Sequence, residues 1–145
     1  MEDKIIKAKE VILNGGVILY PTDTIWGIGC SAIIESAIKK IFRIKRRDNS
    51  KLLISLVSSI EMLERYVKKV PEYALEYLYD ESPTTIIYPK VKGLNHILYG
   101  KNGSVGIRLV KDNFCKALID EINIPLISTS ANISGNPFPK KFKEI

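Results

Sequence analysis

Residues that build metal, redox and acid–base sites are scarce in this sequence. It contains one histidine, His96, and two cysteines, Cys30 and Cys115, among 145 residues. The cysteines follow no metal-binding or redox spacing, and His96 has no partner at a catalytic spacing. We therefore predict that the protein holds no metal of its own. We expect both cysteines to be buried thiols of a cytoplasmic protein.

Long apolar runs and glycine-rich nucleotide loops are missing as well. No apolar run approaches the roughly 20 residues that cross a bilayer, and the charged first segment, MEDKIIKAKE, does not have the pattern of a signal peptide. The P-loop pattern GxxxxGK[ST] is absent, and the glycines of residues 27–29 lack the third glycine of a dinucleotide fingerprint. The sequence therefore predicts no membrane partner and no P-loop.

The composition that remains is that of an ordinary globular protein with an excess of positive charge. Hydrophobic residues make up 46% of the chain and charged residues 26%. Its length suits a single domain over residues 1–145. The formal net charge of +6 favours anionic partners such as nucleotides, phosphates or RNA.

Much of the positive charge lies in one short stretch. Its basic residues are Lys39, Lys40, Arg43, Lys45, Arg46, Arg47 and Lys51. Within it, Ile38, Ile41, Phe42 and Lys45 have helical spacing and so share one helix face. The run therefore fits either the solvated face of a helix or a binding site for an anion.

Strand-like and helix-like segments alternate along the chain. Apolar or β-branched runs predict strands at residues 16–20, 52–58, 84–88, 104–110 and 125–130. Helical patterns of about ten residues lie between most of them, and such alternation is typical of an α/β domain. The segments 84–88 and 104–110 look like two arms of a hairpin. We therefore expect a mixed β-sheet with flanking helices.

Local signals predict how several of these elements begin. Asp3 is placed to cap the first helix, and Asp112 to cap the last one. Ser58 and Glu61 have the spacing of a capping box. The nearly all-apolar strand at 16–20 suits a position that is covered on both faces.

Three polar segments directly follow apolar strands or helices. They are residues 21–24 (PTDT), 45–51 (KRRDNSK) and 128–135 (STSANISG). Strand ends in an α/β sheet form the crevice where ligands bind, so we expect these segments to converge. Ser130 and Asn132 supply a hydroxyl and an amide that suit a nucleotide or an amino acid. The same residues also suit a simple turn that leaves a strand.

Arg108 stands inside an apolar strand, between Ile107 and Leu109. Strand alternation points its side chain to the opposite face from both neighbours, and a buried guanidinium without a partner is costly. Its forked geometry suits a bound carboxylate or phosphate, and exposure to solvent on a sheet face is the alternative. Any metal at such a site would arrive as Mg²⁺ with a nucleotide.

Taken in order, these motifs resemble the threonylcarbamoyl-AMP synthase family, also called the YrdC/Sua5 family. The resemblance rests on YPTDTIWGIG, on the K-x-R pair of Lys45 and Arg47, on VGIR ending at Arg108, and on STSANISG. It implies a twisted, YrdC-like α/β fold with a concave basic cleft. It also implies a nucleotidyltransferase that forms threonylcarbamoyl-adenylate and pyrophosphate from L-threonine, bicarbonate and ATP.

The resemblance further implies a role for each matching residue. Residues implied to bind threonine or bicarbonate are Thr24, Lys51, Arg108 and Ser130. Residues implied to bind ATP are Lys45, Arg47, Ser104, Asn132 and Lys140, and the K-x-R pair is also implied to be catalytic. The adenylate would then pass to the transferase machinery that modifies adenosine 37 of tRNA.

Four features depart from the family pattern. The segment at residues 79–85 (YDESPTT) keeps Pro83 and Thr85 but lacks the tryptophan and glycine of the family's W-P-G-P-x-T, and Val110 replaces a proline that usually follows Arg108 by two residues. Trp26 stands where the family's TDTxYG motif usually has tyrosine, and it still supplies an aromatic wall. The chain also stops at Ile145, before the C-terminal part that family members usually have. Two rival interpretations therefore stay open: a module that binds double-stranded RNA or tRNA through phosphate contacts, and an inactive paralogue of the same fold.

Overall fold

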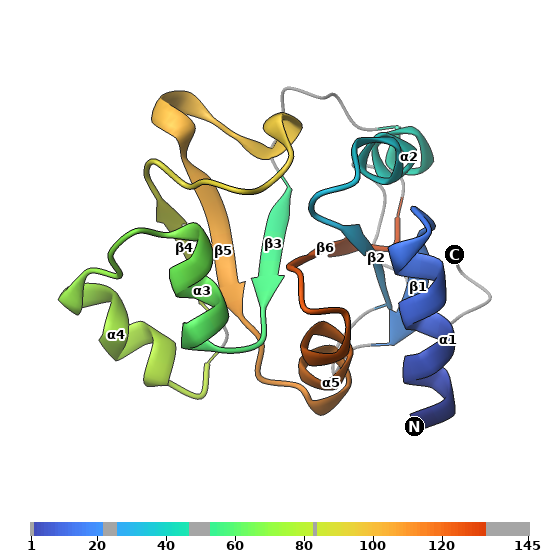
Figure 1. The fold of residues 1–145 in the computed structure, drawn as a ribbon, viewed down its shortest axis with the longest axis horizontal. Helices are drawn as coiled ribbons and strands as arrows, with labels where there is room; N and C mark the ends of the chain where they lie inside the picture. The colour runs from blue at the N-terminus through green and yellow to red at the C-terminus, as the bar shows by residue number, and fades with distance from the viewer. Residues whose placement is uncertain (1, 22–25, 47–52, 83, 133–145) are drawn as a thin grey trace.

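The computed structural model describes residues 2–21, 26–46, 53–82 and 84–132. Within these residues, six strands form one sheet in the order β1-β2-β6-β3-β5-β4 (Figure 1). The strands are β1 (Ile18–Pro21), β2 (Trp26–Ser31), β3 (Ile54–Val57), β4 (Thr85–Tyr88), β5 (Val105–Leu109) and β6 (Leu126–Ser130). The α-helices are α1 (Glu2–Leu13), α2 (Glu35–Lys45), α3 (Ile60–Tyr66), α4 (Glu72–Tyr79) and α5 (Asn113–Ile122).

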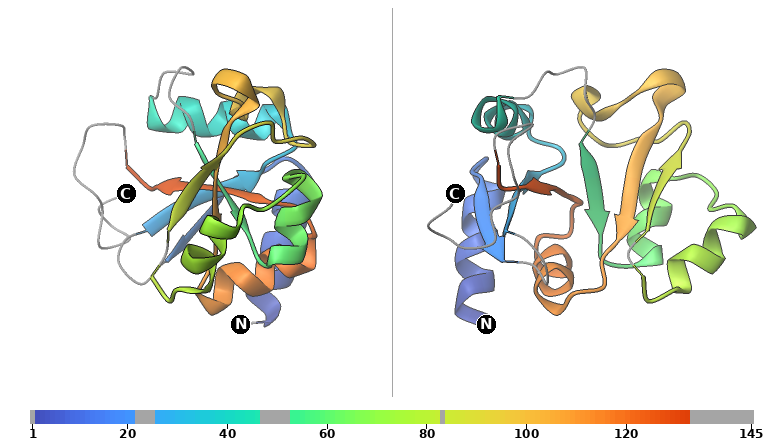
Figure 2. Two further views of the ribbon diagram at one scale, coloured as in Figure 1. Left: turned by 90° about the vertical axis from the view of Figure 1, so that its left-hand side faces the viewer. Right: turned by 180° about the vertical axis from the view of Figure 1, so that it is seen from behind.

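The sheet is mixed and strongly twisted. β3 and β5 run parallel, and the other neighbouring strands run antiparallel. In Figure 1, β3 and β5 run nearly vertically while β6 runs nearly horizontally, and Figure 2 shows the same crossing from two other sides. The prediction of an α/β fold with a mixed sheet and flanking helices is confirmed, including the antiparallel pairing of β4 with β5.

β2 is a strand that the sequence analysis did not predict. Its glycines, Gly27 and Gly29, are unfavourable in strands because they offer no side chain to pack. In the structure the ring of Tyr20 lies against both of them: a Cβ added at Gly27 would meet Tyr20 Cζ at 2.9 Å, and one at Gly29 would meet Tyr20 Cε1 at 3.1 Å. The glycines are therefore part of how β1 and β2 pack.

The expectation that the first strand is covered on both faces is wrong. β1 lies at the edge of the sheet and pairs with β2 alone among the described strands. Leu19 is 37% exposed, whereas the next residue, Tyr20, is 2% exposed. An edge strand with one buried face follows the period-two alternation of a half-exposed sheet.

Two of the predicted helix caps are also wrong, each by a short shift along the chain. Asp3 lies inside the first turn of α1, where its charge interacts favourably with the helix dipole. α3 is capped by Ser59, which accepts a hydrogen bond from Met62 N at 3.0 Å, and not by Ser58. The predicted cap of α5 is confirmed, because Asp112 accepts a 2.9 Å hydrogen bond from Cys115 N.

The core contains both cysteines, as predicted. Cys30 on β2 and Cys115 on α5 are buried thiols outside any disulfide, and they lie among aliphatic side chains. Burial raises the pKa of the Cys30 thiol to about 12, so this thiol is neutral near pH 7.

Among the described helices, none combines the length and the apolar character that a bilayer-spanning helix needs.

Candidate functional site

The ends of several strands meet along one edge of the sheet. We call it the site edge; it consists of strand ends and is not the outermost strand β1. β6 ends at Ser130, which pairs with Gly27 near the start of β2. On its other side, Ser128 of β6 pairs with Ile54, the first residue of β3. β3 is parallel to β5, so β5 also begins at this edge, directly after Ser104. The site is built at this edge.

Lys45 comes from the last turn of α2 and reaches the end of β6. Its ammonium nitrogen lies 2.7 Å from Ser130 O, 3.3 Å from Ser130 Oγ and 3.0 Å from Asn132 Oδ1. Lys45 is only 3% exposed, and these oxygens match the three N–H donors of an ammonium group. The helical spacing that placed Lys45 on the same face as Ile41 and Phe42 is confirmed, because all three are buried.

A second set of hydrogen bonds fixes the turn that follows β6. Ser130 Oγ lies 2.5 Å from Asn132 Oδ1, and Asn132 N donates to Ser130 O at 2.9 Å. Between them, Ala131 N donates to Trp26 O at 2.9 Å, which ties the turn to the start of β2. The side chains of Lys45, Ser130 and Asn132 are thus brought together as one cluster, which we call the Lys45 cluster.

Tyr20 and Ser128 extend this polar surface along the sheet. The Tyr20 hydroxyl is hydrogen-bonded to Ser128 Oγ, and the Tyr20 ring stacks on Phe114 of α5, with centroids 6.0 Å apart. Burial is the main cause that raises the pKa of the Tyr20 phenol, so it stays protonated. Tyr20 was not predicted as a site residue, although its place directly before the PTDT segment could have indicated such a role.

Arg108 lies on β5 and is only partly buried. Its Nε donates to Oγ1 of Thr85, its register partner on β4, at 3.0 Å. Among the described residues no carboxylate forms an ion pair with Arg108, so the forked Nη side of the guanidinium has no protein counter-charge there. This arrangement suits a carboxylate or phosphate ligand. Thr85, which orients Arg108, was not predicted.

Arg108 is not part of the Lys45 cluster. Through Leu56 of β3 it is aligned with Leu126 at the start of β6, whereas Ser130 is the last residue of β6. The two groups are therefore separated along the sheet. Ser104 is closer in register to the end of β6, and it is half-buried after a short turn in which Gly100 N donates to Ser104 O at 2.7 Å.

Four predicted site residues lie outside the described residues: Thr24, Arg47, Lys51 and Lys140. Described residues close to Thr24 and Arg47 in the sequence lie at the site edge. Pro21 and Trp26, on either side of Thr24, pair with each other across β1 and β2. Lys45 and Arg46 precede Arg47, and Asn132 is the last described residue before Lys140.

The basic run has two kinds of residue. Lys39, Lys40, Arg43 and Arg46 are exposed, which is the solvated helix face that the sequence allowed. Lys45 is buried on the opposite side and contacts the β6 end. Among the described residues of α2, the polar contact with the site therefore comes from Lys45.

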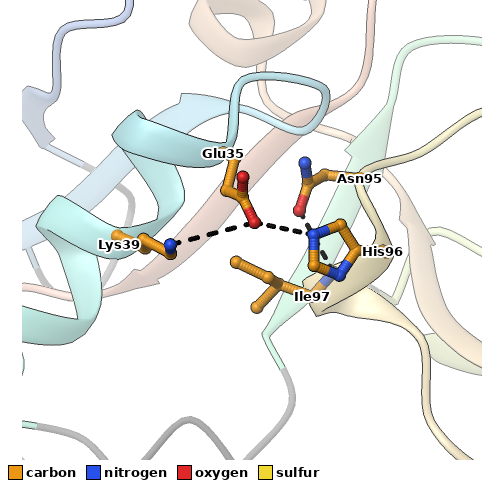
Figure 3. A network of polar contacts seen from close by, with 5 residues as sticks. All are labelled: Glu35, Lys39, Asn95, His96 and Ile97. Atoms are coloured by element: carbon orange, nitrogen blue, oxygen red, sulfur yellow. Dashed lines mark hydrogen bonds and ion pairs between the residues drawn. The ribbon is translucent and has the colours of Figure 1, made fainter.

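His96 lies apart from the Lys45 cluster on the connection between β4 and β5. Its Nε2 contacts Glu35 Oε1 at 2.6 Å, and Glu35 also pairs with Lys39 at 3.9 Å (Figure 3). The His96 side chain is 77% exposed. No group of three or more His, Cys, Asp or Glu residues among those described could hold a metal ion.

The chain is similar to a known protein family and to proteins of two organisms. The Sua5/YciO/YrdC family model, described as telomere recombination, matches residues 10–145. The threonylcarbamoyl-AMP synthase of Haemophilus influenzae is 36% identical over 132 residues, which are 88% of this chain and 72% of that protein. That of Pyrococcus abyssi is 34% identical over 140 residues, which are 95% of this chain and 41% of that protein.

A solved structure gives the same answer for the fold. The crystal structure of P. abyssi Sua5 complexed with L-threonine superposes with a TM-score of 0.86 at 34% sequence identity. The superposition covers 96% of this chain and 42% of that chain. The chain thus spans less than half the length of the P. abyssi synthase and of the solved P. abyssi Sua5 chain.

Proposed function

Because the chain belongs to the Sua5/YciO/YrdC family, we propose that it forms threonylcarbamoyl-adenylate and pyrophosphate from L-threonine, bicarbonate and ATP. In this role it is a nucleotidyltransferase, a threonylcarbamoyl-AMP synthase. The product would supply the transferase machinery that places threonylcarbamoyl on adenosine 37 of tRNA. Support comes from the relatives that carry this name and from the relative whose structure contains L-threonine.

The single observation that carries the proposal is the contact of Lys45 with Ser130 and Asn132. Lys45 belongs to the K-x-R pair, whereas Ser130 and Asn132 belong to the segment STSANISG, and the two motifs lie more than eighty positions apart in the sequence. An ordinary turn after a strand does not require a buried lysine from a distant helix. The contact therefore supports a shared site over the alternative of a simple turn.

The reaction needs a site that aligns reactants and offsets phosphate charge. Bicarbonate and the threonine amine give a carbamate and water, and a carbamate oxygen then attacks the α-phosphorus of ATP. A carbamate O–P bond forms, the bond between the α-phosphorus and the bridging oxygen breaks, and pyrophosphate leaves. Alignment of reactants can lower such a barrier by roughly 7–11 kcal/mol. Fixed cations and hydrogen-bond donors near the phosphates stabilise the transition state further.

The described residues fit this division of work. Arg108, oriented by Thr85, is proposed to bind the threonine carboxylate, and Ser130 another part of the threonine. Ser104 and Asn132, at the site edge, are proposed to contact ATP. Mg²⁺ would enter with the nucleotide and keep several of its waters.

Residues outside the described ranges complete the proposal. Thr24 and Lys51 are proposed to contact threonine or bicarbonate. Arg47 and Lys140 are proposed to contact the nucleotide, with Arg47 facing the phosphates.

The test is pyrophosphate release from ATP with threonine or bicarbonate omitted in turn. We expect release that needs both, and we expect Arg47→Ala and Asn132→Ala to abolish it while the melting temperature stays near that of the wild type. Turnover that ignores both omissions would contradict the proposal. Salt-dependent RNA binding without nucleotide turnover would favour the RNA-binding module, and neither activity would favour an inactive paralogue.

A further inference from the structure

In place of the ATP-binding, catalytic role that the family resemblance implies for Lys45, we infer that Lys45 is a positioning residue. It fixes the hydrogen-bonding direction of Ser130 and Asn132 and does not itself bind the phosphates of ATP. With this assignment, Asn132 meets its ligand as an N–H donor and Ser130 meets its ligand as an acceptor. The inference deepens the proposed function and rests on it for the identity of the ligand. Its physical basis lies entirely in the Lys45 cluster.

The Lys45 ammonium group takes part in hydrogen bonds only as a donor. An ammonium group has three N–H donors and no acceptor. Among the described residues, three oxygens lie within hydrogen-bonding distance: Ser130 O at 2.7 Å, Asn132 Oδ1 at 3.0 Å and Ser130 Oγ at 3.3 Å. A phosphate oxygen would have to displace one of these oxygens from a side chain that is only 3% exposed. A ligand would therefore have to compete with the turn for these donors.

Lys45 also sets the orientation of the Asn132 amide. Because the Lys45 ammonium can only donate, the amide atom that faces it must be the oxygen Oδ1. The same Oδ1 lies 2.5 Å from Ser130 Oγ, which must then donate its hydroxyl hydrogen. Oδ1 thus accepts two hydrogen bonds and has both lone pairs in use. Any further contact of this amide is made by Nδ2, which can only donate.

The hydroxyl of Ser130 takes its direction from Asn132. Its hydrogen is directed at Asn132 Oδ1, so the hydroxyl can meet a further group only as an acceptor. It therefore suits an N–H or O–H of a ligand, such as the amine or hydroxyl of an amino acid. Asn132 in turn suits a phosphate or ring-nitrogen acceptor of a nucleotide. The charge on Lys45 thus decides which partner each residue of the turn can take.

The matched variants are Asn132→Asp, Lys45→Met and Lys39→Gln. Asn132→Asp keeps an acceptor for Lys45 and Ser130 but loses the Nδ2 donors. We expect it to fold like the wild type and to bind ATP about 10- to 100-fold more weakly. Lys39→Gln removes the same charge from the exposed side of α2 and should leave ATP binding within about twofold, since Lys39 contacts only Glu35 among the described residues. Wild-type affinity in Asn132→Asp would overturn the donor role of Asn132.

A double-mutant cycle separates positioning from direct binding. If Lys45 acts through the turn, Lys45→Met weakens ATP binding strongly in the wild type and by less than about twofold in an Asn132→Ala, Ser130→Ala background. If Lys45 binds the phosphates directly, its loss costs the same factor in both backgrounds, and the inference is wrong. Thermal unfolding of each variant shows whether it is folded.

A ligand-independent measurement covers the case in which Lys45→Met does not fold or the wild type binds no ATP. NMR of the ¹⁵N-labelled lysine ammonium groups should show a slowly exchanging Lys45 signal. That signal should shift in Asn132→Ala and stay in place when ATP is added. A Lys45 signal that ignores Asn132→Ala, or one that moves when ATP binds, contradicts the inference. Failure of the proposed function alone would appear as absent ATP binding and turnover with the Lys45 signal and its dependence on Asn132 intact.

Discussion

The ring of Tyr20 occupies the space over Gly27: a Cβ added at Gly27 would lie 2.9 Å from Tyr20 Cζ. The neighbouring Gly29 is equally confined, since its Cβ would lie 2.9 Å from the backbone oxygen of Ile127. Tyr20 reaches over both glycines to Ser128, beside the Lys45 cluster. The Gly-Ile-Gly of β2 therefore has a packing role at the site and needs no bound dinucleotide to explain it.

Gly29→Ala should destabilise the protein by about 1–3 kcal/mol, because the new methyl group meets backbone that cannot move aside. Urea unfolding measures the change in the free energy of unfolding. Gly106→Ala is the control, since its Cβ would meet only the Thr85 methyl group at 3.3 Å and should cost less. Equal stability of Gly29→Ala and the wild type would contradict the close packing of β2.

Thr85→Val should raise the KM for threonine by about two- to tenfold, with little change in the KM for ATP. Valine has the shape of threonine but cannot accept the hydrogen bond from Arg108 Nε, which is worth about 0.5–1.5 kcal/mol. Steady-state kinetics of pyrophosphate release measures both constants. Thr84→Val is the control, because the Thr84 hydroxyl donates to Ser82 O and does not contact Arg108. Equal effects on both substrates would argue against the threonine role of Arg108.

The free energy of unfolding should fall as the pH rises from about 9 to about 12. Burial raises the pKa of Cys30 from 9.0 to about 12, so over this range the unfolded chain releases a proton that the folded chain retains. The stabilisation is therefore complete below pH 9 and is lost towards pH 12. The buried phenol of Tyr20 acts in the same direction. Chemical unfolding across this range should show a smaller slope for Cys30→Ala, and identical slopes would refute the assignment.

Ser59→Ala should cost about 1 kcal/mol of stability, because it removes the N-cap that Met62 N donates to. Ser58→Ala should be neutral or slightly stabilising. The Ser58 hydroxyl is buried and has no hydrogen-bond partner among the described residues. Thermal unfolding of the two variants compares adjacent residues of the same type. If Ser58→Ala destabilised the protein more than Ser59→Ala, the cap of α3 would be Ser58, as the sequence pattern predicted.

His96→Gln should leave pyrophosphate release unchanged and should cost at most about 1 kcal/mol of stability. The contact of His96 with Glu35 (Figure 3) joins two side chains that are 77% and 41% exposed, and exposed ion pairs contribute little. Turnover across a pH series measures the effect. A large loss of turnover would give His96 a role in the reaction that neither its exposure nor its position apart from the Lys45 cluster explains.

Much of the fold could be predicted from local patterns. Helical spacing placed Lys45 on the buried face of α2 with Ile41 and Phe42, and Asp112 was predicted as the cap of α5. Both depend on neighbours within one or two helical turns, so the sequence contains the needed information. The resemblance to a family gave each site residue a specific role, which no single motif did.

Other features required contacts between distant segments. β2 contains two glycines, and the structure pairs it with β1 and β6 and packs the ring of Tyr20 against both glycines. β1 has the apolar run of a central strand, yet its place at the sheet edge leaves Leu19 exposed. Strand order is set by which segments pair, and that choice is not visible in any one of them.

The sequence by itself determined the alternation of helices and strands, the buried face of α2 and the polar composition of the strand ends, because each follows from spacing within a few residues. The tertiary structure decided that Lys45 donates to Ser130 and Asn132 and that Thr85 orients Arg108. The physical reason is that hydrogen-bond direction depends on which donor meets which acceptor. Only the folded sheet brings those groups within 3 Å or so of one another.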